Sequence, residues 1–178
     1  KLSENLFEGL SPWMQKLPGG LIHVNVVGCA LFAAISGSSA ATVATVGKMS
    51  IPELRKRNYP EKILLGSLAG SGTLGLLIPP SIILIIYGVT VQESIAKLFV
   101  AGIIPGIMIA LIFMGYVIIW SLFNKKEMPT ILNNYSFIEK IKKSGQLIPV
   151  ILLIISVIGS IYTGIATATE AASLGVVG

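Results

Sequence analysis

Residues 35–47 read ISGSSAATVATVG, which places the cluster Ser-Gly-Ser-Ser (residues 36–39) in the middle of a long run without charged side chains. A helix can satisfy one hydroxyl by bonding it to its own backbone, but a cluster of this kind favours a turn followed by a new helix N-cap. The turn divides residues 17–47 into two pieces of about 15 residues, and each is too short to cross a membrane comfortably. We therefore expect a re-entrant helical hairpin over residues 17–47, with its tip at the serine cluster.

A second interruption falls in residues 72–88, which read GTLGLLIPPSIILIIYG. Glycines loosen a helix, and a proline in a helix interior costs about 3 kcal/mol because it removes a backbone donor. We expect residues 63–92 to form a discontinuous helix that ends near Gly72 and restarts at the Pro79–Pro80 pair. Non-helical backbone at membrane depth persists only where it is buried or lines a polar cavity, and paired interruptions are typical of transporter binding sites. The alternative is a pair of glycine-rich packing helices with a proline kink.

The composition of the chain is that of a membrane protein. Of its 178 residues 53% are apolar and 12% are charged, with a mean hydropathy of +0.84, whereas charged residues alone make up about a quarter of a soluble domain. The chain has one histidine, His23, one cysteine, Cys29, and no aspartate, so a zinc cluster or a Ser/His/Asp triad has almost nothing to be built from. We predict that it is not an enzyme. An intramembrane hydrolase with Ser38 as nucleophile and His23 as base is the least favoured alternative.

The charged residues define the topology of an all-α polytopic membrane protein. Four uncharged runs each exceed the roughly 20 residues that a helix needs to cross the hydrocarbon layer. Lysine and arginine gather in two loops, with five in each, and basic loops stay on the cytoplasmic side. We assign the formal net charge of +5 to this topology rather than to a nucleic-acid partner. The expected segments are a cytoplasmic lead-in at 1–16, the re-entrant hairpin at 17–47, a basic cytoplasmic loop at 48–62, the discontinuous transmembrane helix at 63–92, a continuous transmembrane helix at 98–124, an amphipathic cytoplasmic interface helix at 125–145, a transmembrane helix at 146–163 and the start of a further, truncated membrane helix at 164–178.

The second basic loop is expected to contain a helix of its own. Apolar side chains recur at helical spacing at Ile131, Tyr135, Ile138 and Ile141, while charged residues project elsewhere. Ser136 with the glutamate three residues later forms a capping box, which marks a helix start. The pattern predicts an amphipathic helix that lies along the cytoplasmic interface.

Three strings together resemble a known family. ISGSSAATVATVG (35–47), GTLGLLIPPSIILIIYG (72–88) and IYTGIATATEAASLGVVG (161–178) occur in the order, and at about the separation, that they have in the large membrane subunit of TRAP transporters, the tripartite ATP-independent periplasmic carriers. The similarity runs from about Gly28 to Gly178. Any one string is weak evidence because glycine-rich apolar segments are common, but three in register are fairly specific. The chain is therefore identified as similar to the DctM-like family.

The resemblance implies a function and its partners. It implies an elevator-type, multi-pass carrier in the bacterial inner membrane that imports an organic acid anion, such as a C4-dicarboxylate or a sialic acid, with sodium as the coupling ion and no other cofactor. A periplasmic binding protein would deliver the substrate, and a small membrane subunit, separate or fused, would accompany this one. The alternatives are a carrier of similar architecture that works without a binding protein, and a non-transporting membrane assembly or scaffold protein.

The resemblance also implies site residues, because the hairpin tip and the interrupted helix match family stretches that supply sodium ligands. Sodium prefers carbonyl and hydroxyl oxygens, which both stretches offer without an acid. Ser36 and Ser81 are the expected substrate-facing hydroxyls, and Thr167 and Thr169 are possible further ligands. The expected sodium ligands are Ser36, Gly37, Ser38, Ser39, Gly72, Thr73, Gly75 and Pro79.

The chain departs from the family pattern at two positions and is expected to be incomplete. Many members have proline where this chain has Ala40 and Ala168, and both changes fall at helix starts, where proline is well tolerated. Because the chain begins at Lys1 without an initiator methionine and stops at Gly178 in an uncharged stretch, we expect a piece of a longer protein. Such a piece would hold about one of the two internal repeats of such a carrier, with its broken helices, and the beginning of the other repeat.

Overall fold

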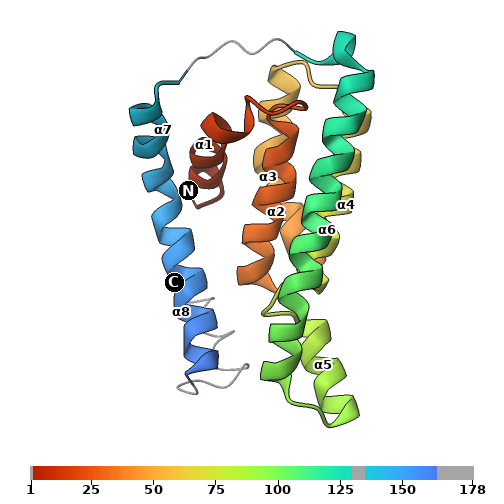
Figure 1. The fold of residues 1–178 in the computed structure, drawn as a ribbon, viewed down its shortest axis with the longest axis vertical. Helices are drawn as coiled ribbons and strands as arrows, with labels where there is room; N and C mark the ends of the chain where they lie inside the picture. Colours follow the sequence, from red (N-terminus) through yellow and green to blue (C-terminus); the bar gives the residue numbers. More distant parts are fainter. Residues whose placement is uncertain (1, 130–134, 164–178) are drawn as a thin grey trace.

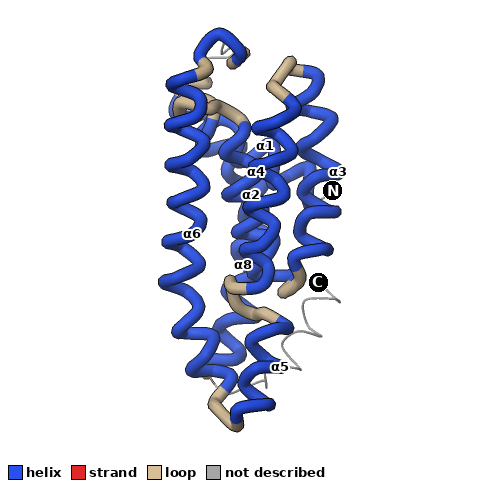
Figure 2. Tube along the Cα trace, turned by 90° about the vertical axis from the view of Figure 1, so that its right-hand side faces the viewer, coloured by secondary structure: helices blue, strands red, loops and turns tan. Residues whose placement is uncertain are grey.

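A computed structural model describes residues 2–129 and 135–163 of the chain, and regular structure in these two stretches is entirely helical (Figures 1 and 2). The elements are α1 (Leu2–Met14), α2 (Ile22–Ser36), α3 (Ser39–Lys56), α4 (Glu61–Gly72), the 3-10 helix η1 (Thr73–Leu76), α5 (Ile82–Val91), α6 (Ile95–Phe123), η2 (Lys125–Glu127), α7 (Phe137–Ser144), η3 (Gly145–Leu147) and α8 (Ile148–Tyr162).

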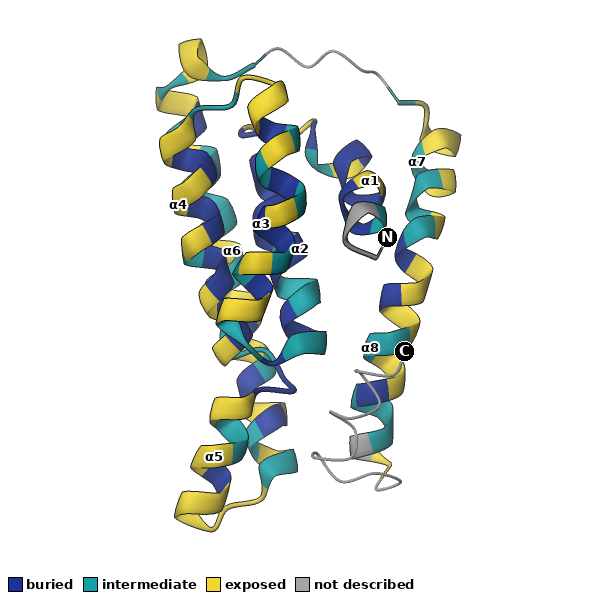
Figure 3. Ribbon diagram, turned by 180° about the vertical axis from the view of Figure 1, so that it is seen from behind, coloured by how far each residue is buried: buried dark blue, intermediate teal, exposed yellow. Residues whose placement is uncertain are grey.

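Helices α2 and α3 form an antiparallel hairpin at the centre of the molecule (Figure 1). The predicted break in the 17–47 run is confirmed, because α2 ends at Ser36 and α3 begins at Ser39. Helix α2 is the most enclosed element and is apolar along most of its length, so Figure 3 shows it largely in the colour of buried residues. Its buried side chains pack against α1, α3 and α4 in one core cluster that includes Ile22, Val24 and Leu64. Re-entry of this hairpin into a membrane remains a prediction.

The second predicted interruption is also present. Helix α4 ends at Gly72, as expected, and one turn of 3-10 helix follows before the chain becomes irregular. The helix resumes at Ile82 rather than at the Pro79–Pro80 pair, because Ser81 is the N-cap and its hydroxyl accepts the N–H of Leu84 at 3.5 Å. The Pro79–Pro80 peptide bond is cis.

Helix α6 runs the length of the molecule beside the interrupted α4–α5 segment (Figure 2). It begins three residues before the predicted Leu98, because Ser94 caps it through the N–H of Lys97. Large apolar side chains such as Ile104 and Leu111 are exposed, and Figure 3 shows how much of α5 and α6 is uncovered. By length and composition, two stretches of the described chain could cross a membrane: Ile95–Phe123 and Phe137–Ser160.

The amphipathic helix predicted at 125–145 is shorter than expected. Residues 125–127 form the separate turn η2, Ile131 lies outside the described residues, and Tyr135 precedes the helix, which covers only Phe137–Ser144. The predicted capping box is confirmed, since Ser136 and Glu139 satisfy each other's backbone N–H groups. The predicted helix was too long because the helical spacing of apolar residues continues N-terminal to the capping box. Helix α7 then continues through η3 into α8, which begins at Ile148 rather than at 146 (Figure 1).

The basic segments gather at one end of the molecule. Lys16 precedes α2, Tyr59 follows α3 and Lys125 follows α6. All three residues line one hollow at that end. The hairpin therefore begins and ends at the end of the molecule where α6 terminates. This agrees with the prediction that the basic loops lie on one side of the membrane. The predicted membrane segment at 164–178, with Thr167 and Thr169, lies outside the described residues.

Candidate functional site

The hairpin tip consists of a left-handed glycine and a helix cap. Gly37 has φ of 60° and ψ of 12°, and its N–H closes α2 by donating to the carbonyl of Ala33 at 3.0 Å. Ser38 then adopts an extended conformation and caps α3 by accepting the N–H of Ala41 at 3.5 Å. Glycine is favoured at the first position because an L-residue is strained at positive φ, and serine is favoured at the second as an N-cap.

This tip lies directly against the irregular segment that follows η1. The N–H of Ile82 donates to the carbonyl of Gly37 at 3.3 Å, so the two interruptions share a backbone hydrogen bond. A Cβ placed on Gly37 would lie only 2.6 Å from the carbonyl oxygen of Pro80. The contact is therefore between two backbones, with no space for a side chain.

Two glycines on the other side of the break bring η1 equally close to the start of α3. A Cβ on Gly75 would lie 2.8 Å from the carbonyl carbon and oxygen of Ser38 and 2.8 Å from the nitrogen of Ser39. A Cβ on Gly72 would meet the side chain of Val43. The sites predicted separately on the hairpin and on the broken helix are thus adjacent in space.

A small set of hydroxyls converges on the carbonyl of Ser38. Thr42 Oγ1 donates to this oxygen at 2.7 Å, and Ser36 Oγ donates to it at 3.3 Å. Ser36 Oγ and Thr42 Oγ1 are also 2.9 Å apart, in contact across the turn. Thr42 is buried and Ser36 is half-buried, so the tip holds two hydroxyls and a carbonyl in one group of neutral oxygens.

The remaining side of the irregular segment is covered by α6. A Cβ on Gly102 would lie 2.8 Å from the carbonyl oxygen of Leu77 and 3.9 Å from Cδ of Pro79, which is buried. Ser81 is also fully buried, and its hydroxyl donates to the carbonyl of Leu76 at 2.6 Å. The predicted substrate hydroxyl of Ser81 is therefore engaged within its own segment in this conformation.

A shallow, open hollow of about 400 Å³ lies beside the tip. Thr73 is exposed there, and its hydroxyl donates to the carbonyl of Gly70 at 2.7 Å. The lining is uncharged and small: Ser39, Ala40, Val43, Ala44, Ala69, Gly72 and Thr73. This mostly apolar lining, in which only Ser39 and Thr73 carry hydroxyls, offers none of the side chains that transition metals prefer, and no cluster of three or more His, Cys, Asp or Glu residues occurs in the stretches that the structure describes.

The structure gathers most, but not all, of the predicted site residues. Residues 36–39 at the tip and residues 72–75 in the break come together at the N-terminus of α3. Pro79 lies toward α6, and the two threonines near the C-terminus are not described. Ion or substrate binding by any of these residues stays a prediction.

Sequence reasoning missed the buried polar residues that join α2 to α4. Asn25 Nδ2 donates to the carbonyl of Leu64 at 3.2 Å and to Ser67 Oγ at 3.0 Å, while Ser71 Oγ donates to the carbonyl of Ser67 at 2.5 Å. This buried network joins the first arm of the hairpin to α4. An asparagine within an apolar arm was the available signal, because a buried amide needs partners. Thr42 was missed as well, although it stands one helical turn after the Ser38 cap.

Comparison with known proteins places this chain in a family. Residues 1–178 match the family described as "Tripartite ATP-independent periplasmic transporter, DctM component". The chain belongs to the DctM family. The family resemblance seen in the three strings is therefore confirmed, and the chain belongs to a family of transport proteins rather than to a family of enzymes.

Three curated relatives illustrate the range of this DctM family. The chain is 40% identical over 159 residues to the C4-dicarboxylate TRAP transporter large permease protein DctM of Pseudomonas aeruginosa, covering 89% of this chain and 36% of the relative. It is 38% identical over 177 residues to the isethionate TRAP transporter permease protein DctMQ of Oleidesulfovibrio alaskensis, covering 97% and 27%. It is 35% identical over 175 residues to the sialic acid TRAP transporter large permease protein SiaM of Vibrio cholerae, covering 97% and 40%. The chain thus spans well under half the length of these relatives.

Proposed function

We propose that this chain supplies one ion-binding and substrate-binding half of a sodium-coupled importer of organic acid anions in the bacterial inner membrane. A periplasmic binding protein delivers the solute, and a small membrane subunit accompanies the large one. The relatives are named for C4-dicarboxylate, isethionate and sialic acid transport, and the acidic group is the common chemistry of these solutes.

The observation that carries the proposal is the backbone contact between the hairpin tip and the broken helix. Gly37 and Gly75 allow backbone to approach backbone at this contact, and Ser36, Ser38 and Thr42 place neutral oxygens beside it. Sodium is a hard cation that accepts such oxygens as ligands, and unwound carbonyls at helix breaks hold cations in secondary transporters. A chain without aspartate is compatible with this chemistry.

The same contact provides a place for the anion. The N-terminus of α3 opens on the hollow beside Ser39 and Ala40, and backbone N–H groups at a helix N-terminus favour a negative charge. Ser36 is half-buried next to this turn and is the better placed of the two proposed substrate hydroxyls. Ser81 can contribute only if its hydroxyl leaves the carbonyl of Leu76.

Coupling follows from the shared geometry. Bound sodium would hold the tip and the break in the arrangement that accepts the carboxylate, and the anion would then bind the sodium-loaded state more tightly than the empty one. The elevator motion proposed for the family would carry this preformed site across the membrane as a unit.

The test uses the full-length permease with its small subunit and binding protein in proteoliposomes. Uptake of labelled succinate, isethionate and N-acetylneuraminate is measured with and without an inward sodium gradient. We expect one of these solutes to accumulate only with the gradient and only with the binding protein present. Accumulation without sodium would refute the coupling, accumulation without the binding protein would favour the simpler carrier, and no uptake of any acid would favour a scaffold.

A further inference from the structure

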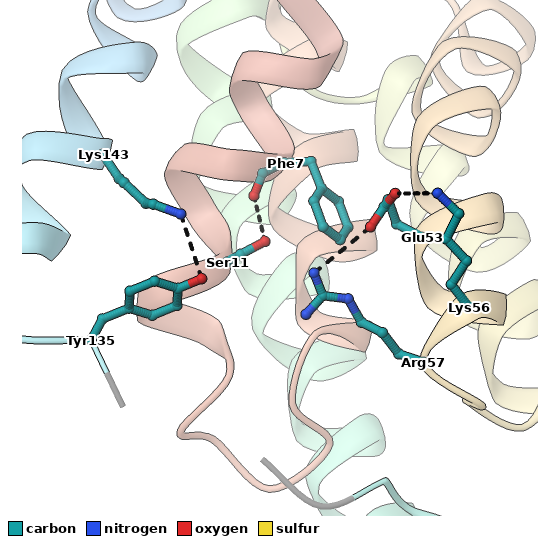
Figure 4. Close-up of polar contacts among 7 residues, drawn as sticks. All are labelled: Phe7, Ser11, Glu53, Lys56, Arg57, Tyr135 and Lys143. Carbon is teal, nitrogen blue, oxygen red and sulfur yellow. Dashed lines mark hydrogen bonds and ion pairs between the residues drawn. The ribbon is translucent and has the colours of Figure 1, made fainter. Parts of the chain in front are cut away.

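A second hollow lies at the opposite side of α3 from the site, close to the junction of α1 and α7. Its volume is about 520 Å³, and it is half-enclosed. Figure 4 shows several of the side chains that surround it. The lining residues are Phe7, Glu8, Ser11, Lys48, Met49, Pro52, Glu53, Arg57, Tyr135 and Lys143.

The cations of this hollow come from two separate elements. Lys48 and Arg57 belong to α3 and the turn that follows it, and Lys143 belongs to the last turn of α7. Lys143 Nζ donates to the hydroxyl of Tyr135 at 3.4 Å and lies 4.6 Å from the centre of its ring. Residues far apart in the sequence thus present positive charge to the same space.

The hollow also contains two carboxylates, of which Glu53 has cationic partners and Glu8 has an amide partner. Glu8 accepts a hydrogen bond from Gln146 at 3.0 Å. Glu53 is shared by Lys56 at 3.3 Å and Arg57 at 3.7 Å. In the part of the chain that the structure describes, neither Lys48 nor Lys143 has a carboxylate within ion-pair distance. The hollow therefore holds three cations against two carboxylates, its two lysines are not paired with either acid, and the Arg57 guanidinium has donors to spare.

We propose that this hollow binds the phosphate of an anionic phospholipid headgroup. Phosphate oxygens accept from several lysine and arginine donors at once, and basic pockets between membrane helices bind such headgroups. The source is a lipid rather than free phosphate because the helix that supplies Lys143 also carries a large exposed apolar face. Phe137, Ile138 and Ile141 are exposed on α7, and exposed isoleucines and leucines continue along α8. Acyl chains would lie on this surface while the phosphate occupies the hollow.

The lipid site is separate from the proposed transport site and does not depend on it. None of its lining residues belongs to the hairpin tip or to the break in the α4–α5 segment. Its test is a binding measurement, so a failure of sodium-coupled uptake would leave it standing, and its own failure would leave the transport proposal untouched.

The experiment titrates the delipidated full-length permease in mild detergent with dioleoyl phosphatidylglycerol, dioleoyl phosphatidylcholine or inorganic phosphate. Native mass spectrometry counts the lipids that the protein retains, and the melting temperature is followed in parallel. We expect phosphatidylglycerol to be retained and to raise the melting temperature, phosphatidylcholine to be retained at least tenfold less, and inorganic phosphate to have little effect.

Matched variants locate the site. Lys48→Gln with Lys143→Gln should weaken phosphatidylglycerol retention more than tenfold, because each basic residue near an anionic headgroup contributes roughly a fivefold factor in affinity. Lys62→Gln with Lys126→Gln removes the same charge from exposed positions that line neither this hollow nor the one beside the tip, and retention should stay near that of the unmodified protein. Lys48→Arg with Lys143→Arg should restore binding.

Each result bears on the proposal. Equal retention of the two lipids, or equal losses in the hollow and control variants, would overturn it. Phosphate that competes with the lipid at equal concentration would show that the hollow is a free-anion site instead. If the glutamine pair elutes as an aggregate, failure of the arginine pair to retain phosphatidylglycerol while remaining monodisperse would refute the site by itself.

Discussion

Two interfaces of the molecule connect distant segments in opposite ways. At the hairpin tip, Gly37 faces the Pro80 carbonyl and Gly75 faces Ser38, so backbone meets backbone. Between α1 and α7, long side chains make most of the specific contacts, and one glycine, Gly9, lies close to backbone, because a Cβ there would be 3.3 Å from the carbonyl oxygen of Lys143. Trp13 Nε1 donates to Ser144 Oγ at 2.8 Å, and the Trp13 ring meets that of Phe137 edge-on at 6.4 Å between centroids.

The difference predicts how each interface responds to change. Long side chains have several rotamers and can adjust by small rotations, whereas two backbones in contact can only move apart. The tip should therefore hold one arrangement against the broken helix. The α1–α7 contact should tolerate small rearrangements without loss of the fold.

The largest effect should come from a methyl group at the tip contact. Gly75→Ala places a Cβ 2.8 Å from the backbone of Ser38, and overpacking of this kind costs about 1–3 kcal/mol. We expect it to separate the tip from the break and to reduce sodium-dependent uptake in proteoliposomes more than tenfold.

Gly66→Ala is the matched control for this substitution. Gly66 lies in the middle of α4, the helix that ends at the same break, and a Cβ there would meet no described atom of a neighbouring element within 4 Å. Alanine should leave uptake unchanged and stabilise the helix by up to about 1 kcal/mol. Equal losses in the two variants would show that the α4–η1 segment is sensitive to any added methyl group and that the backbone contact has no special role.

The sequence predicts the parts of these interfaces that depend on local turn and cap preferences, but not the contacts between distant segments. The breaks at Ser36 and Gly72 were predictable because turn and cap preferences are local. The contact between Gly37 and Pro80 could not be predicted from the residues, because nothing local tells which distant backbone a glycine will meet. The paired interruptions already indicated a binding site, and resemblance to the family supplied the residues expected in it.

The spacing of apolar residues gave the wrong start for α7. The spacing of Ile131 and Tyr135 suggested a longer helix, although the Ser136 capping box already marked a start at Phe137. A cap satisfies backbone donors directly, so it is the stronger boundary signal. The polar network of Asn25 was also missed, because its partners lie in α4 and no local pattern identifies them.

The base of the hairpin offers a contact of intermediate character, in which a side chain meets backbone. The hydroxyl of Tyr59 accepts the N–H of Leu21 at 3.0 Å. Tyr59→Phe leaves this buried donor without its partner and should lower the free energy of unfolding by about 1–2 kcal/mol, measured in denaturant. Phe32→Leu, at a partly buried apolar position of the same core, is a control that should cost no hydrogen bond.

The pH dependence of this variant gives a second readout. Burial raises the pKa of the Tyr59 phenol above its ordinary value of about 10. The neutral form is therefore favoured in the folded protein, and the resulting stabilisation is fully present below the unfolded pKa and is lost as pH rises through the folded one. The stability difference between Tyr59→Phe and the unmodified protein should be constant from pH 7 to 9 and should narrow above about pH 10. A difference that widens there would contradict the buried phenol.

A smaller effect is expected from one hydroxyl at the tip. Ser36→Ala removes the contact with Thr42 Oγ1 and one bond to the carbonyl of Ser38, but it leaves the backbone contact in place. Because a hydrogen bond contributes about 0.5–1.5 kcal/mol net, the apparent sodium affinity for uptake should weaken by roughly fivefold. The melting temperature should change little. Unchanged sodium dependence would place Ser36 among the packing residues.

The smallest effect should come from the side-chain interface. Trp13→Phe keeps an aromatic ring beside Phe137 but removes the donor to Ser144 and weakens the contact with Lys140, whose Nζ lies 5.3 Å from the Trp13 ring centre. Trp13 is 41% exposed, so we expect a loss of at most about 1 kcal/mol in unfolding free energy and no change in sodium-dependent uptake. Uptake reduced as strongly as by Gly75→Ala would show that the α1–α7 interface must also hold a single arrangement. In that case rigidity would be a property of the whole chain and not of the contact that the glycines permit.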